Sequence, residues 1–299
     1  DTIVVGPGTY NESVTVDTAN ITIEGPYVGI PGDDDTRGSS EATVNGTIEM
    51  DANNTTVRGL TVSPATEFNA TASRVAAIFI NANDTLVQNN IVTGVRGNSS
   101  VAGSLSVHGI QIFKQNPDRI GNITVSNNLI RDIENAGGST WPNYGGATGV
   151  KIQNQVDDIR VDNNTIQDIH SAGWTYGIVS SPSSKSSVQP TDLLIEANTI
   201  EGVGNGSVYD VFDDENAAPF PGVAVGLDTA NGTPQADPAG NTSATELRVV
   251  HNDFVDTPIG VGNKDLGAAL AATEKRWGSS AGPNSSGDAG PGNVTTDPI

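Results

Sequence analysis

The chain has 299 residues, with 14 Lys and Arg against 35 Asp and Glu, so its formal net charge is −21. No basic stripe is offered to phosphate groups, which excludes nucleic acid as an expected partner. The absence of cysteine excludes a disulfide framework and thiol chemistry. No apolar run has the length of a signal peptide or a membrane span, so we expect no membrane span in this segment.

The acidic excess is dispersed along the chain rather than gathered in one tail. Such a surface is typical of proteins from high-salt environments, where ions screen the self-repulsion that weakens a folded state in dilute buffer. An ordinary acidic surface is the alternative. We interpret the charge as that of a halophilic protein.

Eight units of similar sequence follow one another. Their pattern is apolar–x–apolar–x–x–Asn–x–apolar, and it is clear at Ile123, Val125, Asn128 and Ile130. The units begin at residues 21, 55, 85, 123, 159, 193, 247 and 270. Apolar residues two positions apart fit a strand with one buried face, and self-similarity on this scale indicates a solenoid.

Two further strands complete each predicted coil. One begins with Gly or Ala before most units, as in 77–80, 109–112, 149–152, 177–179 and 222–225, and one follows the Asn of each unit. The sequence therefore predicts an all-β fold, a right-handed three-stranded parallel β-helix of about eight coils with loop insertions. We expect one domain over 1–299, with N-terminal strands in 1–20, repeat coils in 21–277 and a C-terminal tail or cap in 278–299. Residues 265–275 also fit a helix, but the strand pattern is preferred.

The Asn of the repeat is often doubled, as in Asn89-Asn90, Asn127-Asn128 and Asn163-Asn164. Asn tolerates left-handed backbone geometry, and its side chain bonds to neighbouring backbone groups, so it indicates a turn. Stacked coil upon coil, these residues are predicted to form a ladder of amide hydrogen bonds.

Asn-x-Ser/Thr sequons are unusually frequent. Part of the excess is built into a repeat that favours both Asn and Thr, but most of these sequons lie in predicted turns and loops, where a glycan can attach. We expect a secreted or surface-displayed glycoprotein with some sequons unused. The candidate sites are Asn11, Asn20, Asn45, Asn53, Asn54, Asn69, Asn83, Asn98, Asn122, Asn163, Asn205, Asn231, Asn241, Asn284 and Asn293.

Both ends of the chain carry a family resemblance. The segments 1–16 and 20–25, and the run of Trp277-Gly278, Gly282-Pro283, Gly292-Asn293-Val294 and Pro298, resemble right-handed β-helix proteins of the pectin-lyase-like superfamily. The NosD-like and haloarchaeal surface-glycoprotein branch is the most similar. The resemblance implies the fold but not the function, because this fold serves lyases, hydrolases, epimerases, viral spikes and inert surface modules.

The enzymes of that superfamily place their catalytic groups on outward positions of the Gly-led strand. Here these positions are predicted to hold Phe79, Gln111, Lys151, Val179 and Ala224, with Phe113 and Gln153 two residues on. This column has no carboxylate pair, which glycoside hydrolysis requires. His108 resembles part of a polygalacturonase motif whose companion motifs are missing, and we interpret it as a turn residue. No catalytic residue is assigned.

Two acidic clusters offer oxygen ligands to a hard cation such as Ca²⁺. Neither has the spacing of a known calcium loop, so solvated acidic loops are the preferred interpretation. No cofactor is expected, and the three His residues lack the spacing of zinc or copper ligands. The weak calcium candidates are Asp33, Asp34, Asp35, Asp213, Asp214 and Glu215.

Successive coils also extrude loops at 134–148, 170–176 and 204–221 that hold half of the Phe, Trp and Tyr residues. Stacked loops lie side by side on one edge of a solenoid, so they predict a ridge that binds sugars or docks proteins. The alternative is that the rings pack these loops onto the rod. The ridge candidates are Trp141, Tyr144, His170, Trp174, Tyr176, Tyr209 and Phe212.

Together these features predict an extracellular structural or adhesive element of a halophilic archaeon. Its expected partners are other copies of itself, other surface proteins or cell-surface glycans, and end-to-end assembly into a filament or appendage is one form of the hypothesis. Two alternatives stay open. One is a polysaccharide-active lyase or hydrolase with Asp210, Asp213, Asp214 or His170 in acid–base roles, and the other is a viral spike or fibre.

Overall fold

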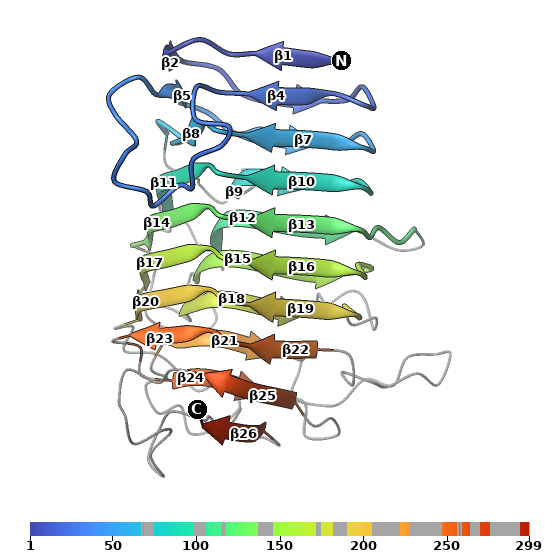
Figure 1. Ribbon diagram of the computed structural model, residues 1–299, viewed down its shortest axis with the longest axis vertical. Coiled ribbons are helices and arrows are strands. Elements are labelled where there is room, and N and C mark those ends of the chain that lie inside the picture. Colours follow the sequence, from blue (N-terminus) through green and yellow to red (C-terminus); the bar gives the residue numbers. More distant parts are fainter. Residues whose placement is uncertain are drawn as a thin grey trace.

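A computed structural model describes residues 1–66, 68, 75–97, 106–114, 118–136, 146–171, 175–181, 190–204, 222–227, 247–255, 257, 259–263, 270–275 and 294–298. This part of the chain contains 26 strands and no helix. The strands wind into a rod, with successive coils stacked along its long axis (Figure 1). The fold is a right-handed three-stranded parallel β-helix, which confirms the prediction from the repeats.

The apolar–x–apolar strands of the eight predicted units form sheet A together with β1 and β26 at its two ends, and all ten strands are parallel. Its register aligns the starts of the units, with Thr85 opposite Ile123, Ile123 opposite Ile159 and Ile159 opposite Leu193. Within 265–275 the structure has a strand, β25, as preferred over a helix. Sheet A consists of β1 (Thr2–Val4), β4 (Thr22–Glu24), β7 (Thr55–Arg58), β10 (Thr85–Gln88), β13 (Ile123–Ser126), β16 (Ile159–Asp162), β19 (Leu193–Glu196), β22 (Leu247–Val250), β25 (Leu270–Lys275) and β26 (Val294–Pro298).

From β1 to β24 the chain passes from sheet A to sheet B and then to sheet C in each coil, and sheets B and C have eight strands each. Sheet B consists of β2 (Gly8–Tyr10), β5 (Ala42–Val44), β8 (Thr61–Val62), β11 (Ile91–Gly97), β14 (Leu129–Asn135), β17 (Thr165–Ser171), β20 (Thr199–Val203) and β23 (Asp253–Val255). Sheet C consists of β3 (Val14–Val16), β6 (Ile48–Met50), β9 (Ala76–Ile80), β12 (Val107–Lys114), β15 (Ala147–Asn154), β18 (Thr175–Ser181), β21 (Val223–Leu227) and β24 (Ile259–Asn263).

Aliphatic side chains fill the space between the three sheets. Along sheet A the inward column is Val57, Val87, Val125, Val161 and Ile195, and all are buried. Burying each such side chain stabilises the rod by about 1.5–3 kcal/mol. A core this narrow is filled by branched aliphatic residues, which explains why only 5% of the residues in the chain are Phe, Trp or Tyr.

Two corners of the rod turn through left-handed backbone geometry. At the A–B corner the residue before the repeat Asn, or before Leu60 in the coil of β7, has a positive φ between 53° and 72°. These residues are Gly59, Asn89, Asn127, Asn163, Ala197 and His251. At the C–A corner the residue before the sheet A strand has φ between 50° and 64° in Asn20, Asn54, Asp84, Asn122, Asp158 and Asp192. Gly, Asn and Asp adopt this geometry at low cost, which explains their recurrence.

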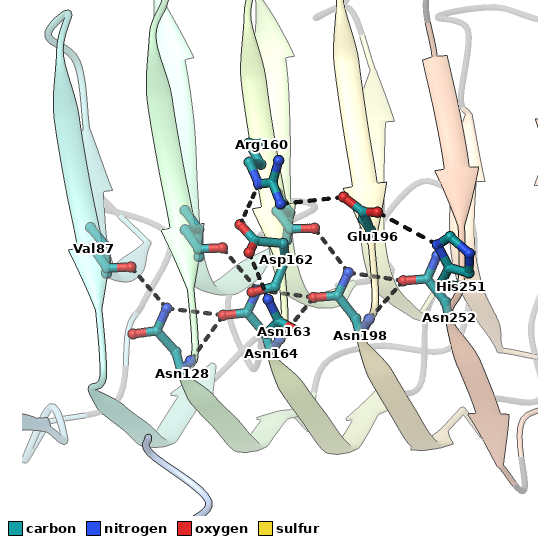
Figure 2. Close-up of polar contacts among 12 residues, drawn as sticks. Val87, Asn128, Arg160, Asp162, Asn163, Asn164, Glu196, Asn198, His251 and Asn252 are labelled. Carbon is teal, nitrogen blue, oxygen red and sulfur yellow. Dashed lines mark hydrogen bonds and ion pairs between the residues drawn. The ribbon is translucent and has the colours of Figure 1, made fainter. Parts of the chain in front are cut away.

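Buried asparagines form the predicted ladder at the A–B corner (Figure 2). The Nδ2 group of Asn128 donates to Oδ1 of Asn164 at 2.9 Å, and the same bond joins Asn164 to Asn198 and Asn198 to Asn252. Each of these acceptor oxygens also receives the backbone N–H of the preceding rung. The ladder therefore satisfies turn groups that lie out of reach of water.

Candidate functional site

A shallow groove of about 490 Å³ follows the C–A corner across the coils from β7 to β19. Two neighbouring columns of polar residues line it. The groove residues are Asn53, Asn83, Asp84, Gly121, Asn122, Asp157, Asp158, Thr191 and Asp192.

Side chains along the C–A corner bond from one coil to the next. The Nδ2 group of Asn54 donates to Oδ1 of Asn20, and that of Asn122 donates to Oδ1 of Asp84, both at 2.7 Å. In the second column Oδ1 of Asn53 accepts the backbone N–H of Asn83 at 3.0 Å. The corner is thus an outer counterpart of the buried ladder, and its exposed amides face solvent.

The groove is acidic, with four Asp residues among its lining. Arg119 lies beside it, and its Nη1 is 3.4 Å from Oδ2 of Asp157 and 2.8 Å from Oγ1 of Thr191. Among the described residues no group of three or more His, Asp and Glu is placed to hold a metal ion. The groove offers hydrogen-bond acceptors to hydroxyl-rich molecules, and its lining includes the Asn residues of three candidate sequons, Asn53, Asn83 and Asn122.

The outer face of sheet C corrects one sequence prediction. Phe79, Gln111, Lys151 and Val179 share a column as expected, but Gly226 rather than Ala224 continues it. Ala224 belongs to the core, where it occupies the position of Gly177 in the preceding coil.

Crowding at this inward position explains the error. A Cβ atom built on Gly109, Gly149 or Gly177 would lie 2.6–2.7 Å from Cγ2 of an Ile on sheet B, so only a small residue fits there. Gly222, which the sequence suggested as the equivalent of Gly177, is instead pressed against the backbone of Val203. Because Gly and Ala occupy several positions in this segment, the outward position of this coil was predicted two residues too early in the sequence.

His108 is 2% exposed and lies within strand β12, in register with Thr148. Burial disfavours the charged imidazole and lowers its pKa well below the usual value, and the nearby Lys151 charge acts in the same direction. Phe79 and Phe113 meet on the same face with ring centroids 6.1 Å apart. His108 is thus a buried residue within strand β12 rather than the turn residue predicted from the sequence.

Two members of the predicted aromatic ridge are described. His170 is exposed in β17 of sheet B, opposite Glu134. Tyr176 is 3% exposed in β18 of sheet C, with its ring packed over Gly226 of the next coil. The structure therefore places these two residues on different sheets. The other candidates, Trp141, Tyr144, Trp174, Tyr209 and Phe212, lie outside the described residues.

The first acidic cluster, Asp33–Asp35, belongs to a segment that runs along the rod. This axial strap, residues 25–41, joins β4 to β5 and descends along the rod to the level of β11 and β14 (Figure 1). Asp33 accepts a hydrogen bond from Thr165 in β17. Hydrogen bonds from the side chain and then the backbone of Thr36 lower the pKa of Asp34. Asp33 thus binds the strap to β17 and Asp34 stabilises a turn within the strap, while Asp210, Asp213, Asp214 and Glu215 lie outside the described residues.

Eight of the candidate sequons are described: Asn11, Asn20, Asn45, Asn53, Asn54, Asn83, Asn122 and Asn163. The side chains of these Asn residues are exposed or half-buried, and all lie in turns or between strands. The other seven, Asn69, Asn98, Asn205, Asn231, Asn241, Asn284 and Asn293, lie outside the described residues.

An ion-pair network on sheet A was missed by the sequence analysis (Figure 2). Arg160 lies 3.0 Å from Asp162 and 3.3 Å from Glu196, and Nδ1 of His251 is 3.5 Å from Glu196. The hydrogen bond and charge of Asp162 raise the pKa of Arg160. The network could have been found in the sequence, because Arg160, Asp162 and Glu196 alternate with the apolar residues of β16 and β19 and therefore face outward. The pairs that Glu196 makes with Arg160 and His251 join partly exposed side chains and contribute little stability.

No family model matches this chain, and no curated protein was found to match it. Within the described residues no helix is long and apolar enough to cross a membrane. The function is therefore inferred from the fold and from the placement of its polar side chains.

Proposed function

We propose that this chain is an N-glycosylated structural or adhesive rod of the extracellular surface of a halophilic archaeon. The observation that carries the proposal is the position of Asn20, Asn54 and Asn122, which lie exposed on left-handed turns of one corner. A glycan on these side chains projects into solvent and displaces nothing in the core. Glycans along the rod would also obstruct a long polymeric substrate, which favours a structural role over a polysaccharide-active enzyme.

Three further features support this role. The buried ladder and the continuous aliphatic core give a stiff scaffold. The net charge of −21 suits a protein screened by molar salt. The resemblance of both chain ends to the NosD-like, haloarchaeal branch of the pectin-lyase-like superfamily suggests the same surface location.

The proposal includes end-to-end association of the rods, because a parallel sheet can be extended by pairing another strand at its terminal strand. Negative-stain microscopy of native material in molar salt tests it. We expect filaments whose axial repeat is near the rod length, roughly 40–50 Å for coils about 4.8 Å apart. Dispersed single rods, confirmed as monomers by light scattering in the same salt, would contradict the filament and redirect attention to glycan binding.

A further inference from the structure

The segment 53–56 contains two overlapping sequons, Asn53 with Thr55 and Asn54 with Thr56. Side chains alternate between the faces of a strand, so the two hydroxyl groups lie on opposite sides of β7. Thr55 is 1% exposed, and its Oγ1 donates to the carbonyl oxygen of Ala52 at 3.1 Å. Thr56 is half-buried on the outer face.

The same division recurs along sheet A. Thr85, the hydroxyl residue of the Asn83 sequon, is in register with Thr55 and is 3% exposed. Thr22 and Thr124, which complete the Asn20 and Asn122 sequons, share the outer column of Thr56. The fold thus separates sequons with an inward hydroxyl from sequons with an outward one.

Resting on the proposed glycosylation, we propose that the folded rod is the acceptor and that it selects Asn54 over Asn53. A sequon is defined by its hydroxyl as well as its Asn, so a modifying enzyme must reach both. Asn20, Asn54 and Asn122 then form one axial row of glycans on the C–A corner. Asn53 and Asn83 stay unmodified although their side chains are partly or fully exposed.

The chemistry fits the hydrogen bonds of this corner. Nδ2 of Asn54 forms a bond to the anomeric carbon of a phosphate-linked sugar donor, the bond from that carbon to the phosphate oxygen breaks, and the phosphate leaves with the electron pair. Nδ2 gives up one proton, which the departing phosphate takes up, and keeps the other. The remaining N–H can still donate to Oδ1 of Asn20, now 2.7 Å away, so the corner ladder survives modification.

A matched pair of variants tests the selection. Asn53→Asp and Asn54→Asp both remove an acceptor, and Asp84, Asp158 and Asp192 hold the position of Asn54 in other coils with the same positive φ. Glycopeptide mass spectrometry is performed on the chain purified from its native host. We expect Asn54→Asp to lower glycan occupancy of the 51–60 segment at least tenfold and Asn53→Asp to leave it unchanged.

A second pair changes only the hydroxyl. Thr56→Val should remove the glycan, whereas Thr55→Val should retain it in every molecule that folds. A glycan found on Asn53 or Asn83 in the wild-type chain would overturn the selection but leave the glycoprotein proposal intact. A wild-type chain without any glycan would overturn both proposals.

Discussion

At the scale of single residues, both Nδ2 and Oδ1 of Asn164 form hydrogen bonds, and the residue is only 1% exposed. Its Nδ2 donates to Oδ1 of Asn198 and to the carbonyl oxygen of Val125, each at 2.9 Å. Its Oδ1 accepts both the backbone N–H and the Nδ2 group of Asn128, at 3.0 and 2.9 Å. A single side chain therefore satisfies groups from the coils on both sides of its own.

Replacing Asn164 by Ala should leave several of these groups buried without partners. Each buried unsatisfied group costs about 1–3 kcal/mol, so we expect the free energy of unfolding to fall by about 3 kcal/mol or more. Urea denaturation in molar salt measures the change. The control is Asn163→Gly, which keeps the left-handed turn at an exposed neighbour and should shift stability by only about 0.5 kcal/mol. Equal losses in the two variants would contradict a special role for the ladder.

His108 makes stability depend on pH because its folded-state pKa is lowered by burial and by Lys151. The unfolded chain takes up a proton on this residue near pH 6.5, and the folded chain does so only well below that value. The unfolded state therefore binds more protons as pH falls below about 6.5, so stability is full above this pH and decreases below it.

Melting temperatures between pH 8 and pH 5 test this prediction. We expect the free energy of unfolding of the wild type to decline by about 1 kcal/mol per pH unit from His108 alone once the pH is below about 6.5. His108→Gln should flatten this part of the profile, while His170→Gln, at an exposed position, should leave it in place. An unchanged slope in His108→Gln would refute the assignment.

At the scale of elements, the axial strap is fastened by Arg37, whose side chain is 4% exposed. The guanidinium makes two 2.9 Å bonds to Glu41, and its Nη1 donates to the carbonyl oxygen of Asn89 at 2.7 Å. It also lies 4.8 Å from the centre of the Tyr27 ring. Further along, Gly32 donates its N–H to the carbonyl oxygen of Asn127. The strap thereby ties coils that are distant in sequence.

Arg37→Ala should release the strap and leave Glu41 without its buried partner. Breaking a buried pair typically costs several kcal/mol, and because Glu41 is partly exposed we expect about 3 kcal/mol. The free energy of unfolding from denaturant titration gives the value, and limited proteolysis should show faster cleavage within 25–41. Arg96→Ala serves as the control. Its pair with Glu134 is half-exposed on both sides, so its loss should stay below about 1 kcal/mol.

Local patterns predicted the repeating elements well. Alternating apolar residues and a turn Asn report which side of a strand is buried and where the chain bends, so the register of sheet A followed from the spacing of the units. Ala197 and His251 show the limit, because they adopt the left-handed turn without the residue types that announce it. There the stacking of neighbouring coils decides the geometry.

Contacts between distant segments could not be predicted in the same way. The bond from Arg37 to Asn89 spans 52 residues and depends on the path of an insertion that has no repeat of its own. The inward position of Ala224 depends on Ile side chains of the facing sheet, as the clash built on Gly177 with Ile200 shows. At the C–A corner the Asn and Asp residues of the turns could be recognised in the sequence. Whether the Thr of each sequon faces inward or outward became clear only from the strand register.

At the scale of the whole molecule, stacking brings carboxylates of neighbouring coils to equivalent positions on the C–A corner. Asp158 and Asp192 precede strands that pair directly, so these exposed residues occupy adjacent coils. Strand spacing places such charges about 4.8 Å apart, where like charges in water repel by about 1 kcal/mol. The net charge of −21 adds weaker repulsion over the whole rod.

Salt should therefore stabilise the rod strongly. The Debye length falls from about 10 Å at 0.1 M to about 3 Å at 1 M, which screens repulsion between coils. We expect the melting temperature to rise steadily as KCl increases from 0.1 M to 2 M. Asp158→Asn with Asp192→Asn keeps residues that tolerate the left-handed turn and removes two charges. This variant should melt higher than the wild type at 0.1 M KCl and gain less from added salt. Salt also strengthens apolar burial, and this second effect does not depend on the charge of the protein. Identical salt dependence in the variant and the wild type would therefore show that salt acts through apolar burial and not by screening the charges of this corner.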